Sequence, residues 1–175
     1  MNFERIFLVG FMCSGKSTLG RLLSERLGWK FVDTDEEIER LEGASIPEIF
    51  EKRGEDYFRR LELEVLSRLA KEKNLVISTG GGLGANLLAM DVMKGSGLVV
   101  WLNLDFQSFL KRCGNDPSRP LLKRSKEELL KLFKDRAEVY QRAHLVLDAT
   151  LKPEVLVEKL LENIGFVPYN LWTGG

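Results

Sequence analysis

The sequence predicts an α/β fold in which a central parallel sheet of five strands is flanked by helices on both faces. Short, continuous apolar runs recur along the 175 residues, and amphipathic stretches with capping signals separate them. Strands buried on both faces form such runs, and regular alternation of strands with helices is typical of a parallel sheet. No internal repeat or linker interrupts the pattern, so we expect a single domain over residues 1–175.

Each predicted element has its own local signal. The strands are the apolar runs at 6–9, 30–32, 75–77, 98–102 and 144–147. Leucines at helical spacing follow the first run, and Gly28 stands where a helix C-cap glycine belongs. Ser45 and Ser125 are each followed three residues later by glutamate, which is the pattern of a capping box. Pro153 suits the first turn of a last helix, which we expect to end near Gly165.

Composition excludes several classes of protein. Lysine plus arginine and aspartate plus glutamate both total 26, so no net charge attracts nucleic acid or an anionic membrane. The apolar run near the N-terminus is too short for a signal peptide or a membrane span. Cys13 and Cys113 are the only cysteines, and we expect both to be reduced thiols of a cytoplasmic protein.

The loop between the first strand and the first helix carries the strongest functional signal. It reads GFMCSGKST and contains Gly10, Gly15, Lys16, Ser17 and Thr18. The two glycines let the backbone turn so that consecutive N–H groups point at phosphate oxygens, next to the positive end of a helix. Lysine at this position reaches the β and γ phosphates, and the following hydroxyl is a ligand for Mg²⁺. The loop predicts a nucleoside triphosphate site.

Two carboxylates follow the second strand in VDTDEEIE. Asp33 ends the strand and Asp35 lies two residues further on, so both belong to the carboxyl edge of the sheet, where ligands bind. One can hold Mg²⁺ or its waters, and the other can orient or deprotonate an acceptor hydroxyl. The alternative is that Asp35 only caps the next helix.

Two further motifs contain charged residues or glycines. In GEDYFRRLELE, Arg59 and Glu62 are three residues apart and can pair on a helix, although the pair could equally be a solvated one. In VISTGGG, a strand runs into the glycines 80–82, which predicts close approach of a ligand to the backbone or else a plain flexible turn.

The segment 112–125 is basic and is interrupted by glycine and prolines, with Arg119 near its middle. Loops of this length in a compact domain are commonly lids, and phosphoryl transfer benefits from a cation that arrives on closure. We expect a mobile lid here, with an ordinary surface loop as the alternative.

Together these motifs resemble the shikimate kinase family of P-loop kinases, in its order and roughly at its spacings across residues 6–165. The resemblance rests on GFMCSGKS, DTD, FRRLE, TGGG, RPLL and DRAEVY. It implies an ATP-dependent kinase that phosphorylates a ring hydroxyl of shikimate, the 3-hydroxyl, in aromatic amino acid biosynthesis. We expect a monomer whose partners are shikimate and ATP, with Mg²⁺ as cofactor.

The resemblance also implies roles for individual residues. Asp35 corresponds to the residue that binds the acceptor hydroxyls and can act as base, within a shikimate-binding region at about 33–62. The residues it assigns to the rest of the shikimate site are Arg59, Gly81, Gly82 and Arg136. The residues it assigns to the nucleotide and metal are Gly10, Gly15, Lys16, Ser17, Thr18, Asp33, Arg112, Arg119 and Pro153.

Two other functions are compatible with parts of the pattern. Another small-molecule P-loop kinase, acting on gluconate or a nucleoside monophosphate, would share the phosphate loop. A nucleotide-dependent switch would share it too, but it needs a catalytic glutamine or an arginine supplied in trans, whereas this sequence offers an arginine of its own in the expected lid.

Overall fold

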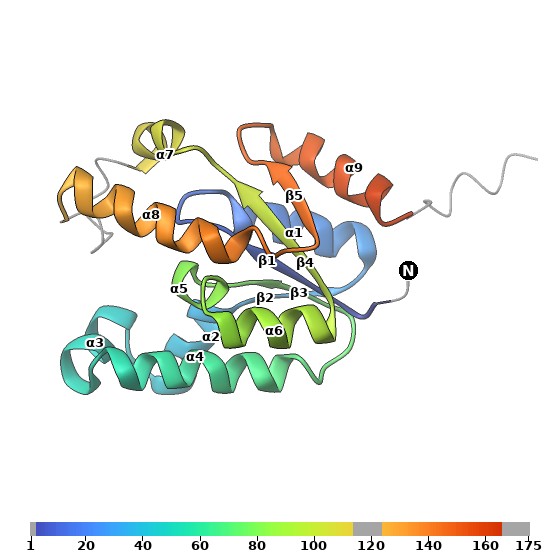
Figure 1. Cartoon of the computed structure of the whole chain (residues 1–175). Helices are drawn as coiled ribbons and strands as arrows, with labels where there is room; N and C mark the ends of the chain where they lie inside the picture. The colour runs from blue at the N-terminus through green and yellow to red at the C-terminus, as the bar shows by residue number, and fades with distance from the viewer. Residues whose placement is uncertain (1–2, 114–123, 166–175) are drawn as a thin grey trace, which may run out of the picture.

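The computed structural model describes residues 3–113 and 124–165, and it confirms the predicted fold (Figure 1). One sheet of five strands runs through the described residues in the order β2-β3-β1-β4-β5, and every neighbouring pair is parallel. The strands are β1 (Arg5–Val9), β2 (Lys30–Asp33), β3 (Leu75–Ser78), β4 (Leu98–Asn103) and β5 (Leu145–Asp148). Each predicted apolar run lies in one of these strands, except that β5 begins at Leu145, one residue after the predicted start.

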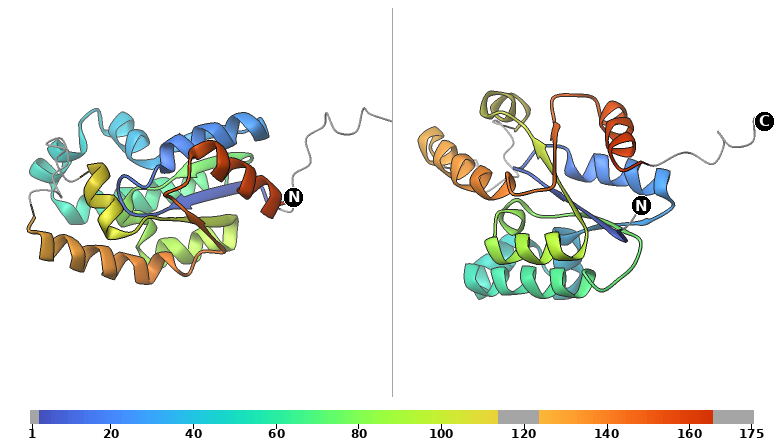
Figure 2. Two further views of the ribbon diagram at one scale, coloured as in Figure 1. Left: turned by 90° about the horizontal axis from the view of Figure 1, so that it is seen from above. Right: turned by 45° about the vertical axis from the view of Figure 1, so that its right-hand side comes forward.

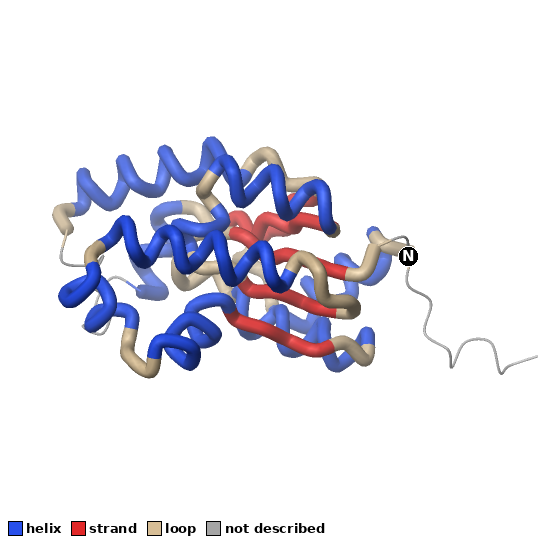
Figure 3. Tube along the Cα trace, turned by 90° about the horizontal axis from the view of Figure 1, so that it is seen from below, coloured by secondary structure: helices blue, strands red, loops and turns tan. Residues whose placement is uncertain are grey.

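Helices cover both faces of the sheet, as expected (Figures 2 and 3). Helices α1 and α9 pack together on one face, and α4 and α6 pack together on the other. The helices are α1 (Lys16–Leu27), α2 (Thr34–Glu42), α3 (Ile46–Arg53), α4 (Glu55–Leu69), α5 (Gly81–Gly84), α6 (Leu87–Ser96), α7 (Phe106–Cys113), α8 (Lys126–Tyr140) and α9 (Pro153–Asn163).

The local signals in the sequence set the helix boundaries. Gly28 ends α1 in the left-handed conformation, with φ 70°, which a residue with a Cβ rarely adopts. The hydroxyls of Ser45 and Ser125 accept hydrogen bonds from the third backbone N–H of α3 and α8. Pro153 begins α9, where its missing N–H leaves no hydrogen bond unmade.

The central strand β1 is fully enclosed. Ile6, Phe7, Leu8 and Val9 have 0% of their surface exposed, because β3 and β4 flank the strand and helices cover both of its faces. This burial on both faces explains why the run is apolar without alternation. Since all strands are parallel, the loops that follow β1, β2 and β3 emerge together at the carboxyl edge of the sheet, where such folds bind ligands.

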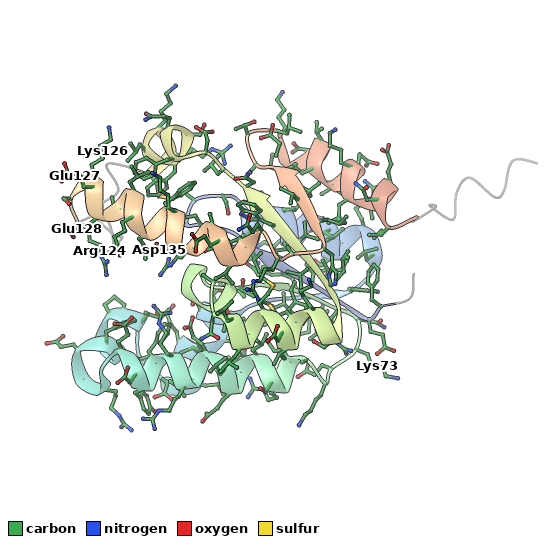
Figure 4. All side chains as sticks on the ribbon, in the orientation of Figure 1. Lys73, Arg124, Lys126, Glu127, Glu128 and Asp135 are labelled. Carbon is green, nitrogen blue, oxygen red and sulfur yellow. A yellow bond between two sulfur atoms is a disulfide. The ribbon has the colours of Figure 1, made fainter. Side chains whose placement is uncertain are left out.

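The expected lid segment is partly helical. Arg112 and Cys113 are the last residues of α7, not the start of a loop, and Ser125 caps α8. Residues 114–123, which include Arg119, and the tail 166–175 lie outside the described residues. Figure 4 shows Lys126, Glu127 and Glu128 projecting outward from the first turn of α8, where all three are exposed.

Candidate active site

The loop from Gly10 to Gly15 has the backbone geometry of a phosphate cradle. Gly10 and Gly15 adopt φ angles of 154° and 93°, and Cys13 between them has φ 62°. A Cβ on Gly10 would lie 2.7 Å from the carbonyl oxygen of Leu102, so only glycine fits there. Lys16 is the first residue of α1, and its Nζ donates to the carbonyls of Gly10 at 2.7 Å and Phe11 at 3.1 Å. The cation is thereby held over the mouth of the loop.

Ser14, inside the same loop, has a buried hydroxyl whose hydrogen-bonding capacity is not used by the described residues. Its side chain is 2% exposed, and among the described residues its Oγ makes no hydrogen bond. A buried hydroxyl without a partner is costly unless a ligand or water satisfies it. The start of α1 adds backbone N–H groups that have no partner within the helix. The loop therefore fits a phosphate group.

Asp33 links the phosphate loop to the second strand. Ser17 donates its hydroxyl proton to Asp33 Oδ2 at 2.9 Å, so the two expected metal ligands lie together. Asp33 Oδ1 accepts from the backbone N–H of Asp35 at 2.9 Å and of Glu36 at 3.2 Å. Asp33 is thus the cap of α2, and the alternative reading of Asp35 as that cap is wrong. Asp35 lies in the first turn of α2, and its carboxylate does not cap the helix.

The Asp35 carboxylate has an unusual charge environment. Burial, followed by repulsion from Asp33, raises its pKa from 3.8 to about 6, although Lys16 and Arg59 act in the opposite direction. The carboxylate therefore lies within electrostatic reach of both the phosphate-loop lysine and Arg59. A group with this pKa is ionised at neutral pH and can still accept a proton, as a general base must.

The glycine cluster after β3 makes room for three charged side chains. A Cβ on Gly80 would lie 2.7 Å from Asp35 Oδ1, and one on Gly81 would lie 3.0 Å from Arg136 Nη1. A Cβ on Gly82 would overlap the Arg59 guanidinium. The sequence indicated close approach of a ligand or a flexible turn, but the immediate reason for these glycines is the protein's own carboxylate and guanidinium groups. The cluster brings all three to one place.

Arg59 is held by a buried partner. Its Nη1 donates to Glu62 Oε1 at 2.6 Å, and Glu62 is only 2% exposed. The solvated-pair alternative is therefore wrong. Burial raises the Glu62 pKa to about 7, against the opposing effect of Arg59. Burial lowers the Arg59 pKa, but Glu62 and Glu55 together raise it by more. The pair fixes the direction of the guanidinium.

Arg136 comes from α8 on the other side of the glycine cluster. Burial lowers its pKa, and nearby Arg59 adds to the effect because the two cations repel. Its guanidinium also lies over the ring of Phe11, 5.7 Å from the centroid. Two guanidinium groups this close, beside the partly exposed backbone of Gly81 and Gly82, form a site suited to an anion such as a carboxylate.

Two residues that the sequence did not single out hold the glycine cluster in position. Thr34 is 0% exposed, and its Oγ1 accepts from the backbone N–H of Gly80 at 3.0 Å. Tyr140 is 1% exposed, and its hydroxyl donates to the carbonyl of Gly81 at 2.6 Å. Tyr140 lies one helical turn after Arg136 and on the same face. This spacing of four residues was the signal in the sequence that could have associated Tyr140 with the site.

The nucleotide end of the site is bounded by Arg112. Its guanidinium donates to the carbonyl of Ala149 at 2.7 Å and to the carbonyl of Cys13 at 3.4 Å. It therefore joins the phosphate loop to the loop after β5, which leads to Pro153 at the start of α9. The expected place of Arg112 beside an adenine stays a prediction.

The expectation of two reduced thiols is wrong for this structure. Cys13 and Cys113 form a disulfide across 100 residues, with their Cα atoms 6.2 Å apart. Sequence could not place them together, because one lies in the phosphate loop and the other ends α7, and only the fold makes these segments neighbours.

Within residues 3–113 and 124–165, no group of three or more histidine, cysteine, aspartate or glutamate side chains could hold a metal ion unaided. Mg²⁺ does not require such a group, because it commonly keeps one or two protein ligands and takes the rest from phosphates and water. Ser17 and Asp33 fit that pattern. In the same part of the chain, no helix is long and apolar enough to cross a membrane.

A phosphate loop at the carboxyl edge of a parallel sheet, facing a carboxylate and two arginines, defines a small-molecule kinase of the P-loop class. Comparisons with known proteins specify the family. The family model described as shikimate kinase matches residues 12–165. The chain belongs to the shikimate kinase family.

Relatives match over nearly the whole chain. A shikimate kinase of Aquifex aeolicus is 51% identical over 157 residues, covering 90% of this chain and 94% of that protein. A crystal structure of shikimate kinase from Acinetobacter baumannii in complex with shikimate has a TM-score of 0.87 at 40% identity, covering 93% of each chain. A gluconokinase from Sinorhizobium meliloti has a TM-score of 0.61 at 19% identity over 97% of this chain and 95% of its own, and this likeness shows the fold alone.

Proposed function

We propose that this protein transfers the γ-phosphate of ATP to the 3-hydroxyl of shikimate, giving shikimate 3-phosphate. The observation that carries the proposal is the convergence of Asp35, Arg59 and Arg136 on one glycine cluster, opposite the phosphate loop. Shikimate combines a carboxylate with ring hydroxyls, and this site offers two guanidinium groups for the first and the half-buried Asp35 carboxylate for the second. Identity of 51% to a shikimate kinase supports the same substrate.

Acceptor binding, as we propose it, depends on the arginine pair. Arg59 and Arg136 grip the shikimate carboxylate, while the backbone of Gly81 and Gly82 contacts the substrate. Glu62 keeps the Arg59 guanidinium in one direction through its 2.6 Å hydrogen bond. A substrate anchored at its carboxylate presents its hydroxyl in a defined orientation, which lowers the entropic part of the barrier.

The Asp35 carboxylate then acts on the acceptor hydroxyl. It accepts the hydroxyl proton as the oxygen attacks phosphorus, or orients the hydroxyl for attack. Lys16 moves from its hydrogen bonds with the Gly10 and Phe11 carbonyls to the phosphates and stabilises the charge that develops on them. The backbone of residues 10–18, including Thr18, cradles the phosphates. Arg112 and Pro153 flank the adenine, and Arg119 approaches the phosphates from a lid.

Ser17 and Asp33 would hold Mg²⁺, directly or through water. The ion supplies charge neutralisation on the phosphate oxygens. The 2.9 Å contact between the two side chains supports this assignment, since it places the two oxygens next to each other beside the phosphate loop. Removal of divalent cations with EDTA should abolish turnover, and added Mg²⁺ should restore it. Full activity in EDTA would contradict the assignment.

The test of the function is an acceptor panel. ADP release is measured with shikimate, gluconate, a nucleoside monophosphate and no acceptor, at fixed ATP and Mg²⁺. We expect turnover with shikimate alone and little ATP consumption without it. Turnover of gluconate or the monophosphate in place of shikimate would favour another small-molecule kinase, and rapid hydrolysis with no acceptor would favour a nucleotide switch.

We further propose that the enzyme acts as a cytoplasmic monomer. The side chains assigned to both substrates all come from one chain, so the site needs no second copy. Sedimentation of the purified protein near 19.9 kDa would support this state, and a stable dimer would contradict it.

A further inference from the structure

The disulfide between Cys13 and Cys113 lies at a point where it can control nucleotide binding. Cys13 belongs to the phosphate loop, and Cys113 ends α7 directly after Arg112. Arg112 in turn contacts the carbonyls of Cys13 and Ala149. The bond joins the phosphate loop to α7, and the Arg112 hydrogen bonds link both segments to the loop after β5.

The backbone conformation of Cys13 indicates whether the disulfide strengthens or weakens ATP binding. Its φ of 62° is in the left-handed region, which L residues other than glycine seldom occupy. A covalent bond to buried Cys113 holds this conformation, whereas a free thiol lets residue 13 relax to more favourable angles. If the loop adopts the phosphate-binding conformation for only a fraction of the time, its apparent affinity for ATP falls in proportion to that fraction.

We infer that Cys13 and Cys113 form a redox modification site whose disulfide state favours ATP binding and whose dithiol state weakens it. This inference rests on the proposed use of ATP, and it does not depend on the identity of the acceptor. The Cα separation of 6.2 Å falls in the range that a disulfide requires, so the fold itself brings the two residues within bonding range.

The exchange chemistry is that of a disulfide with a small or protein dithiol. A thiolate of the reductant attacks Cys13 Sγ, because Cys13 is partly exposed whereas Cys113 is 2% exposed. The S–S bond breaks, Cys113 leaves as a thiolate and takes up a proton, and a mixed disulfide remains on Cys13. The second thiol of the reductant then releases Cys13 as a thiol and becomes oxidised itself. With glutathione, a second glutathione molecule releases Cys13. Oxidation by oxidised glutathione is the reverse of that sequence and releases two glutathione thiols.

The experiment compares the two states of the same full-length protein. It is equilibrated with defined ratios of reduced and oxidised glutathione, and free thiols are counted by alkylation and intact mass. ATP affinity is measured by calorimetry without shikimate, and shikimate affinity is measured as an internal control. We expect the dithiol form to bind ATP on the order of 10-fold more weakly and shikimate equally well. The melting temperature should be several degrees higher in the disulfide form.

Reciprocity provides a second, independent readout. If the bond changes ATP affinity by a given factor, saturating ATP must shift the thiol–disulfide equilibrium by the same factor. In Cys113→Ser, and in Cys113→Ala in case the serine variant folds poorly, ATP affinity should match the reduced wild type at every glutathione ratio.

Three results would overturn the inference. They are two free thiols at every glutathione ratio, equal ATP affinity in both states, and an equal loss of shikimate affinity, which would indicate a general effect on the fold. A failure of ATP to bind in either state would contradict the proposed function instead, so the two failures are distinguishable.

Discussion

Replacement of Asp35 by asparagine separates catalysis from stability. The change keeps the size of the side chain but removes its charge and its capacity to accept a proton. Since Asp33 and not Asp35 caps α2, the helix keeps its cap in Asp35→Asn. A positioned general base contributes about 10²–10⁴ in rate, so kcat should fall by that factor. ATP affinity should change little, because the phosphate loop and Asp33 are intact.

The same substitution should stabilise the folded protein above pH 6. The rise of the Asp35 pKa from 3.8 to about 6 corresponds to roughly 3 kcal/mol lost when the ionised carboxylate is buried, as an upper estimate. A group with a raised pKa is neutral in both states at low pH. Its cost grows as pH rises from the unfolded pKa of 3.8 and is complete above the folded pKa of about 6. Asp35→Asn should therefore match wild type in stability below about pH 4 and exceed it at pH 8, by up to several degrees in melting temperature.

The assay measures kcat, kcat/KM and melting temperature on one preparation between pH 4 and pH 9. Wild-type kcat/KM should decline with an apparent pKa near 6 as pH is lowered, and the residual activity of the variant should lack that limb. Glu36→Gln is the matched control, because Glu36 is an exposed acid in the same first turn, and its removal should leave kcat unchanged. Normal turnover in Asp35→Asn would refute the catalytic role, and a lower melting temperature at pH 8 would refute the burial argument.

Four other substitutions test the rest of the site by the same kinetics. Lys16→Ala should lower kcat by ~10²–10³ with the fold retained, and a folded variant with near-normal kcat would remove the lysine from the mechanism. Arg59→Lys should raise the KM for shikimate sharply and leave that for ATP unchanged, since lysine lacks the planar fork; a parallel rise of both would contradict a dedicated clamp. Gly82→Ala should raise the same KM by about 10- to 100-fold, because the new methyl group displaces the Arg59 guanidinium. Tyr140→Phe should cost about 1–3 kcal/mol in unfolding free energy and raise the KM for shikimate, and a change in stability alone would reduce Tyr140 to a packing role.

The fold was predictable because its signals are local. The apolar run 6–9 is a strand buried on both faces, Gly28 and Ser45 set helix ends, and residues 10–18 carry the phosphate-loop motif. Each of these features depends on interactions within a few residues, so the sequence contains them directly. The phosphate loop was likewise identifiable, since its chemistry needs only that segment and the strand and helix beside it.

The position of Asp35 after the second strand indicated an acceptor role, but the roles of Arg59 and Arg136 could be predicted only by likeness to a family. Asp35, Arg59 and Arg136 are separated by up to about a hundred residues, and nothing local indicates that they meet at one glycine cluster. For the same reason the sequence left two readings of Asp35 open. The structure decided between them, because Asp33 already accepts the N–H groups that a cap would satisfy.

The sequence by itself determined the class of fold, the nucleotide loop and the candidate residues. Only the tertiary structure decided what surrounds them. It shows that Glu62 is buried and so orients Arg59, and that Tyr140 and Thr34 hold the glycine backbone. It also shows that Cys13 and Cys113 are bonded. The physical reason is that burial, and contacts between segments far apart in the chain, exist only after the chain has folded. Dihedral preferences and hydrophobic patterns are already present in the unfolded sequence.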